Sequence, residues 1–145
     1  MPERLDRDSI LSHIDHLRRA VTELRRRAPI TPDALAASTE LLWFVAYGLQ
    51  LAIQNVIDVA TQMVAVLSGE APDDYRSVIE GLGRLHVLDP DFANRIAPMA
   101  GLRNVLVHGY LRLDAERLAA ALNELDDLAT FAAAVTTFLK ANPKL

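Results

Sequence analysis

The chain has 145 residues and is rich in leucine and alanine, with 51% hydrophobic and 23% charged residues, which suits one helical domain over residues 1–145 and argues against disorder. The formal net charge of -4 argues against a general basic nucleic-acid binder, although an enzyme that touches a few phosphates through a local cluster stays compatible with it. Because the sequence has no cysteine, disulfides and thiolate metal sites are excluded.

The N-terminal part predicts an amphipathic helix that ends at about Arg27, with Asp8 or Ser9 as its cap. The residues before this helix are charged and lack the apolar core of a signal peptide, so a cytoplasmic location is the default expectation. Three arginines at positions 25–27 suit the negative end of the helix dipole. We favour that explanation over an RNA-binding patch.

A second helix is predicted from Pro32, capped by Thr31, to about Leu67. It carries no charge between Glu40 and Asp58, so a membrane span must be considered, since a spanning helix needs about 20 apolar residues. We reject a span because polar residues recur at helical spacing along one face. These residues, named the polar stripe below, are Tyr47, Gln50, Gln54, Asp58 and Thr61. The stripe either satisfies its own hydrogen bonds in the core or faces a polar site or partner.

A third helix is expected to start at Asp73 or Asp74, after Pro72, and to reach about Leu85. Tyr75 is one of its apolar residues, which recur at helical spacing. A further helix begins near Pro90, and Pro98 kinks or restarts it before the chain enters the next motif.

Residues 101–110 read Gly-Leu-Arg-Asn-Val-Leu-Val-His-Gly-Tyr and place Arg103, His108 and Tyr110 at the close of an apolar helical run. Arginine can bind a phosphate through two hydrogen-bond donors, and histidine is the side chain whose unperturbed pKa lies nearest neutral pH. The pair therefore suits phosphodiester chemistry. On an unbroken helix Arg103 and Tyr110 align, whereas His108 points away from Arg103. Convergence on one phosphate therefore requires the helix to end at about His108, which Gly109 allows, or two copies of the motif to face each other.

The roles of these residues follow from their chemistry. His108 would take the proton from a ribose 2′-hydroxyl, which attacks the neighbouring phosphorus and leaves a 2′,3′-cyclic phosphate without a metal. Arg103 would stabilise charge on the phosphate oxygens, and Asn104 would orient His108 or donate to a phosphate. Tyr110 would position the substrate through its hydroxyl or stack on a base. The structural alternative is that the histidine only caps the helix.

Asp114 is predicted to cap the last helix, whose apolar residues continue to Lys140 and close the core. The segments together predict an all-α fold, an antiparallel bundle of four to five helices. The sequence has no repeat, no glycine-rich phosphate loop and no metal motif. His13 and His16 could share a helix face but have no third ligand nearby, so we interpret both as surface or packing residues. We expect no metal and no cofactor.

The pattern Arg-x4-His-x-Tyr resembles the motif of the HEPN ribonucleases, and the string from Met99 to Asp114 is similar to the HepT toxin branch of that family. The second helix, with residues 51–58, is also similar to the corresponding helix of the family. The resemblance implies a HEPN-like homodimer whose motif helices meet across a two-fold axis. It also favours a polar stripe that faces the site, with Asp58 as its most interesting member.

The resemblance further implies the toxin of a type VII toxin-antitoxin system, a metal-independent endoribonuclease that cleaves tRNA or mRNA. In that family a cognate MntA-like nucleotidyltransferase antitoxin transfers AMP from ATP onto the motif tyrosine, here Tyr110. The added phosphate would block the cleft through repulsion and bulk. ATP and magnesium would belong to the antitoxin. The alternative is a non-catalytic helical partner or substrate-binding module of a nucleotidyltransferase, in which Arg103 and His108 only bind.

Overall fold

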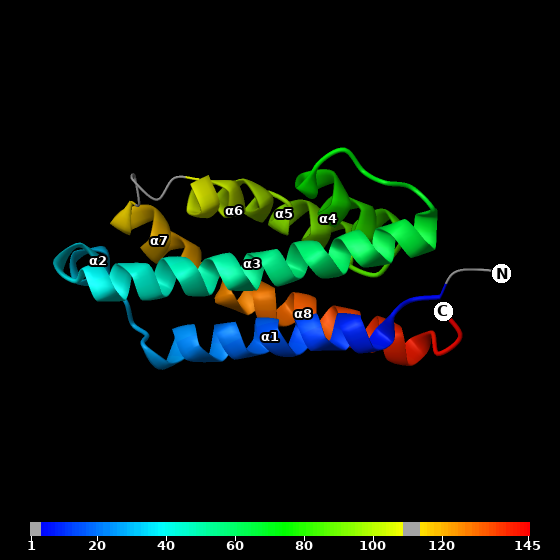
Figure 1. Cartoon of the computed structure of the whole chain (residues 1–145), viewed down its shortest axis with the longest axis horizontal. Helices are drawn as coiled ribbons and strands as arrows, with labels where there is room; N and C mark the ends of the chain where they lie inside the picture. Colours follow the sequence, from blue (N-terminus) through cyan, green and yellow to red (C-terminus); the bar gives the residue numbers. More distant parts are fainter. Residues whose placement is uncertain (1–3, 109–113) are drawn as a thin grey trace.

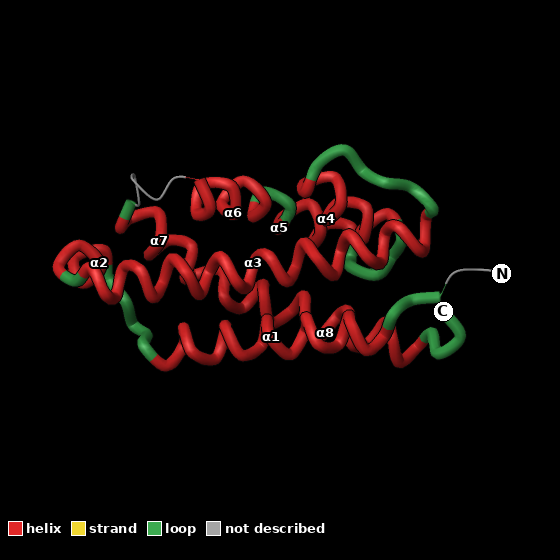
Figure 2. Tube along the Cα trace, in the orientation of Figure 1, coloured by secondary structure: helices red, strands yellow, loops and turns green. Residues whose placement is uncertain are grey.

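A computed structural model describes residues 4–108 and 114–145 of the chain, and all regular structure within these ranges is helical (Figures 1 and 2). The elements are α1 (Arg7–Arg26), α2 (Pro32–Ala37), α3 (Thr39–Ser68), α4 (Tyr75–Arg84), α5 (Pro90–Ile96), α6 (Met99–His108), α7 (Ala115–Ala121), the 3-10 turn η2 (Leu122–Glu124) and α8 (Leu125–Ala141). The all-α bundle prediction is confirmed. Breaks within the predicted segments divide them into more and shorter helices.

Helix α1 lies antiparallel to α3 and packs against α8 (Figure 1). Its cap is Asp6 rather than the predicted Asp8 or Ser9, because the Asp6 carboxylate accepts a hydrogen bond from the Ser9 amide at 3.1 Å. The Arg7 guanidinium donates to the Leu139 carbonyl at 2.7 Å, which satisfies an acceptor in the last turn of α8. This contact ties the start of α1 to the end of α8.

The predicted second helix is two helices, α2 and α3, because Ser38 leaves helical conformation and caps α3. The Ser38 hydroxyl accepts from the Leu41 amide at 3.1 Å, so a new first turn starts there. Gly69 ends α3 with a left-handed φ of 71°, a conformation that glycine adopts without a steric penalty.

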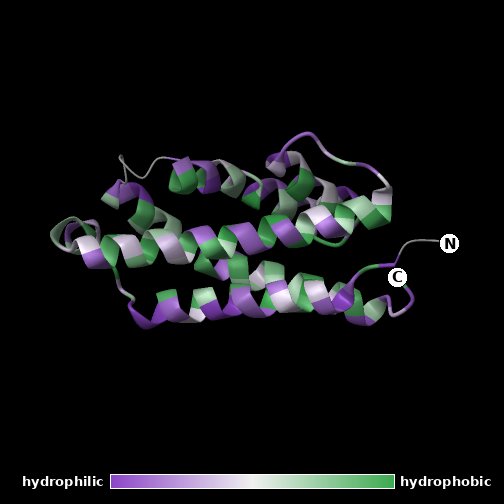
Figure 3. Cartoon of the chain, in the orientation of Figure 1, coloured by the Kyte–Doolittle hydropathy of each residue, from purple (hydrophilic) through white to green (hydrophobic). Residues whose placement is uncertain are grey.

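Helix α3 is long and apolar enough to cross a membrane by length and composition alone, but half of its most apolar window is buried inside the protein. Figure 3 shows hydrophilic and hydrophobic residues alternating along α3. This mixture is the property of a core helix with one face at the surface rather than of a helix surrounded by lipid.

Helices α4, α5 and α6 cover the other side of α3 (Figure 1). As predicted, the chain restarts at Pro98, since α5 ends at Ile96 and α6 begins at Met99. The predicted last helix begins after Asp114 but is interrupted by η2 before α8, which carries the fully buried Phe131. The hydrophobic core contains residues from every α-helix, so the short helices are all anchored to the same interior.

Candidate functional site

Arg103 lies at the centre of a hydrogen-bonded cluster between α3 and α6. Its Nε donates to the Gln54 side-chain oxygen at 2.8 Å, and its Nη1 makes a longer contact of 3.3 Å with the Asn104 side-chain oxygen. The guanidinium carbon lies 5.2 Å from the centroid of the Tyr75 ring, within the range of a cation–π interaction. The half-buried Arg103 is therefore contacted from α3, from α4 and from its own helix.

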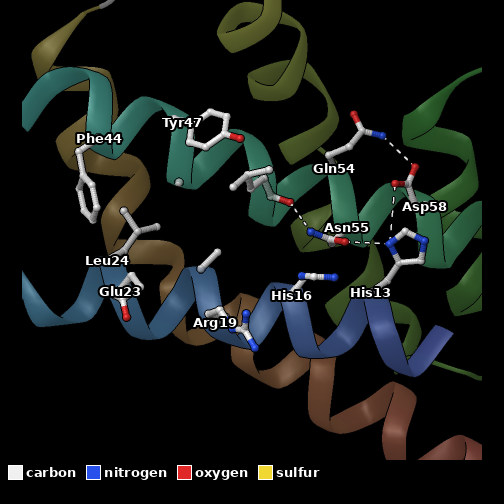
Figure 4. A pocket seen from close by; sticks show the side chains of 13 residues that line it. His13, His16, Arg19, Glu23, Leu24, Phe44, Tyr47, Gln54, Asn55 and Asp58 are labelled. Atoms are coloured by element: carbon white, nitrogen blue, oxygen red, sulfur yellow. Dashed lines mark hydrogen bonds and ion pairs between the residues drawn. The ribbon is translucent and has the colours of Figure 1, made fainter. Parts of the chain in front are cut away.

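The cluster continues from Gln54 towards α1 (Figure 4). The Gln54 side-chain NH2 donates to Asp58 Oδ1 at 2.9 Å, and Asp58 Oδ2 lies 4.0 Å from His13 Nδ1. His13 Nδ1 is 2.8 Å from Asn55 Oδ1, and the Asn55 NH2 donates to the Leu51 carbonyl at 2.8 Å. Because the Asn55 NH2 is used in that bond, its oxygen accepts from His13, and the His13 proton is on Nδ1. His13 is thus a hydrogen-bonded packing residue, as predicted.

The polar stripe lies at the surface and not in the core, since no polar or charged side chain among the described residues is buried. Tyr47 is 61% exposed, whereas Gln54 and Asp58 are half-buried. The Thr61 hydroxyl donates to the Ile57 carbonyl at 2.8 Å. The alternative of a network inside the core is therefore wrong. The other alternative agrees with Gln54, which donates to Asp58 and also accepts from the motif arginine.

Two hollows flank Arg103. A groove of about 550 Å³ between α1 and α3 is lined by Gln54 and Asp58 together with apolar side chains such as Phe44 and Leu51 (Figure 4). A second hollow, of about 600 Å³, is lined by residues from the start of α4 and from α6, including Tyr75 and Asn104. Arg103 contacts Gln54 of the first hollow and Tyr75 and Asn104 of the second.

His108 is the last residue of α6 and is exposed. Residues 103–108 belong to one continuous helix, in which side chains five positions apart are about 140° apart around the axis. Within one protomer Arg103 and His108 consequently point to different sides of α6. Gly109 and Tyr110 lie outside the described residues, so their assignments stay predictions.

Tyr75 is one of the apolar residues at helical spacing in the predicted third helix, but its side chain is 39% exposed beside Arg103. Asp74 sets its position by capping α4, because the Asp74 carboxylate accepts from the Ser77 amide at 2.7 Å. The hydrogen bonds from Ser77, first from its amide and then from its hydroxyl, hold the pKa of Asp74 below its ordinary value. No sequence pattern indicated the Tyr75 contact, which depends on how α4 packs against α6.

Other candidate binding groups have partners within the protein. Arg25 pairs with Asp126, Arg26 with Glu23 at 2.8 Å, and Arg27 lies 4.6 Å from the centroid of the Phe44 ring. These contacts agree with a structural role for the arginines at the end of α1. Within residues 4–108 and 114–145, no group of three or more His, Asp and Glu residues is placed to hold a metal ion.

The model of one protein family, described as ribonuclease HepT-like, matches residues 12–135 of the chain. A protein of Archaeoglobus fulgidus is 31% identical over 122 residues, which cover 84% of this chain and 86% of that protein. The tRNA nuclease HepT of Aphanizomenon flos-aquae is 31% identical over 115 residues, which cover 79% of this chain and 78% of that protein.

Similarity to a solved structure extends over nearly the whole fold. The tri-AMPylated HEPN toxin of Shewanella oneidensis, in complex with MNT antitoxin, matches with a TM-score of 0.79 over 90% of this chain and 98% of that chain. The sequence identity is 20%, so this likeness supports the fold and carries no residue roles.

Proposed function

Because the chain belongs to the HepT-like ribonuclease family, we propose that it is a toxin of a type VII toxin-antitoxin system and cleaves RNA as a metal-independent endoribonuclease. The observation that carries the proposal is an arginine of the complete Arg-x4-His-x-Tyr pattern held in place by Gln54 and Tyr75, in the same helix as the exposed His108. A relative is named as a tRNA nuclease, which makes tRNA the first substrate to test and mRNA the second.

In the proposed reaction, His108 accepts the proton of a ribose 2′-hydroxyl while the 2′-oxygen attacks the adjacent phosphorus. The bond from phosphorus to the 5′-oxygen breaks, and the products are a 2′,3′-cyclic phosphate and a 5′-hydroxyl once that oxygen is protonated. Arg103 Nε is already used by Gln54, so the Nη1 and Nη2 end of the guanidinium is the part that donates to the phosphate oxygens. Asn104, in contact with Nη1, is a second donor to the phosphate.

We also propose that the active form is a homodimer. Trp43, Tyr47 and Leu51 are spaced by four residues on one face of α3, and their side chains are 64%, 61% and 41% exposed. This apolar face continues into Gln54, three residues after Leu51, and Gln54 contacts Arg103. A second copy that covers the face would lie beside Arg103. Its motif would then supply the histidine for this Arg103, because His108 of the same protomer points to a different side of α6.

The cognate partner we propose is an MntA-like nucleotidyltransferase antitoxin that transfers AMP onto Tyr110. The structural neighbour described as a tri-AMPylated HEPN toxin with MNT antitoxin supports this partner class. A bound adenylate would bring negative charge and bulk to the end of the motif and oppose RNA phosphates there. ATP and magnesium act with the antitoxin, this chain uses no cofactor of its own, and both proteins work in the cytoplasm.

The proposal is tested by inducing the chain without an antitoxin and sequencing total RNA for new ends that carry a cyclic phosphate. The wild type should stop growth and produce such ends, and His108→Ala and Arg103→Ala should do neither while their helical circular dichroism is unchanged. His86→Asn is the matched control, since His86 is an exposed histidine with a left-handed φ of 58°, which asparagine tolerates. If the folded wild type cuts no RNA, the catalytic proposal fails and Arg103 and His108 become residues of a binding groove.

A further inference from the structure

We propose that Gln54 is a positioning residue for Arg103, and that Asp58 fixes the direction in which the Gln54 amide points. The proposal deepens the function proposed above, because it rests on Arg103 being the group that binds the scissile phosphate. Neither residue touches the reacting atoms in this account. Both act through the guanidinium of Arg103.

The first step of the argument is the orientation of the Gln54 amide. Its NH2 donates to the Asp58 carboxylate at 2.9 Å, and its oxygen accepts from Arg103 Nε at 2.8 Å. Turning the amide over would place its NH2 against the N–H of Arg103 and its oxygen against a carboxylate, which are two repulsive contacts. The carboxylate on one side and the guanidinium on the other therefore select a single orientation.

The second step is the charge of Arg103. A carboxylate bonded directly to a guanidinium would form an ion pair and compete with a phosphate for the same donors. Gln54 is neutral, so it holds Nε while Asp58 stays one side chain away from the guanidinium. The arrangement fixes Arg103 and leaves its positive charge for an anionic substrate.

The third step is a second contact to the guanidinium, whose central carbon lies 5.2 Å from the centroid of the Tyr75 ring. One hydrogen bond fixes a distance, and a cation–π contact from another helix adds a second restraint on the guanidinium. Gln54 and Tyr75 come from α3 and α4, helices that pack against each other in the core. The position of Arg103 is thus set by the bundle rather than by the flexible side chain alone.

The experiment compares Gln54→Leu with Gln62→Leu, a matched change on the same helix. Gln62 is also half-buried, but its NH2 donates to the Ser9 hydroxyl of α1 at 3.1 Å. With purified dimer and a short RNA, Gln54→Leu should lower kcat by about 10- to 100-fold through misplacement of the arginine, with a smaller effect on KM. Gln62→Leu should leave kcat unchanged.

Substitutions of Asp58 separate positioning from direct chemistry. An asparagine at 58 still offers an oxygen to the Gln54 NH2, so Asp58→Asn should lower kcat by less than about threefold, whereas Asp58→Ala should lower it by about tenfold. Loss of all activity in Asp58→Asn, or equal effects of the two glutamine variants, overturns the proposal.

A second measurement does not depend on activity. In the NMR spectrum of the arginine side chains, the Arg103 Nε–H signal, identified by its loss in Arg103→Lys, should exchange slowly with water in the wild type and in Gln62→Leu. It should exchange at least about tenfold faster in Gln54→Leu, since the hydrogen bond is gone. If the wild type cuts no RNA, the proposed function fails while this signal still decides whether Gln54 holds Arg103. Equal exchange in all three proteins overturns the positioning role.

Discussion

Helix α4 meets α5 closely at Gly83, and this approach can be tested by adding one methyl group. A β-carbon on Gly83 would lie 2.8 Å from the Ala93 Cβ and 3.2 Å from the Pro90 Cα, and neither atom is the end of a flexible side chain. Gly83→Ala therefore forces α4 and α5 apart. Gly101 is the matched site, because it is exposed in α6 and a β-carbon there meets no described atom within 4 Å.

The expected free energies follow from these distances. Replacing glycine by alanine inside a helix stabilises it by at most about 1 kcal/mol, and this gain applies at both sites. Overpacking of a close helix contact costs about 1–3 kcal/mol and applies only at Gly83. Gly101→Ala should thus raise the free energy of unfolding by up to about 1 kcal/mol. The free energy of unfolding of Gly83→Ala should be about 1–3 kcal/mol lower than that of Gly101→Ala.

The assay is urea unfolding followed by circular dichroism, with all proteins at one concentration because a dimer makes stability concentration-dependent. The m-value should be the same for the wild type and both variants, so that the midpoints compare stability directly. Equal stabilisation by the two alanine substitutions would refute the close contact of α4 with α5.

Three further predictions concern the proposed interface, the cap of α4 and the core. Leu51→Asp should halve the mass measured by light scattering and abolish RNA cleavage. Leu11→Asp should do neither, because Leu11 has a similar exposure but does not line the groove. A Leu51→Asp protein that is still a dimer would contradict the interface. Since the Ser77 amide lowers the pKa of Asp74, the ionised carboxylate stabilises the fold above its unfolded pKa, and this contribution is lost as the pH falls through the lower folded pKa. The stability difference between wild type and Asp74→Asn should therefore shrink on acidification in urea unfolding, and a difference that grows would contradict the cap. Phe131→Ala should cost about 3–5 kcal/mol in the same assay, because the ring is fully buried, and a cost below about 1 kcal/mol would contradict its place in the core.

Much of the helical framework could be read from local signals. Thr31, Asp74 and Asp114 cap helices as predicted, since a cap depends only on a side chain and the amides two or three residues later. Two predictions, the cap of α1 and the single helix over α2 and α3, were wrong for equally local reasons. Asp6 caps α1 two residues before Asp8, the earlier of the two predicted caps, and Ser38 stops a helix whose apolar pattern continues past it.

The motif was also visible in the sequence, because Arg103, Asn104 and His108 are close along the chain. The structure brings Asp58 into the same cluster through Gln54, as the helical spacing of the polar stripe suggested. Tyr75 could not be assigned in this way, since its spacing fits an inward position equally well.

Composition, caps and helical periodicity therefore determined that the chain is an all-α bundle and where most helices begin, and the motif supplied the residues that we propose for phosphodiester chemistry. Only the tertiary structure decided that Gln54 and Tyr75 hold Arg103 from two other helices, and that Trp43 and Tyr47 remain exposed on α3. The reason is physical: periodicity specifies which face of a helix is apolar, but the rotation and offset between two helices come from packing the whole core. Contacts between side chains on different helices depend on that rotation and offset.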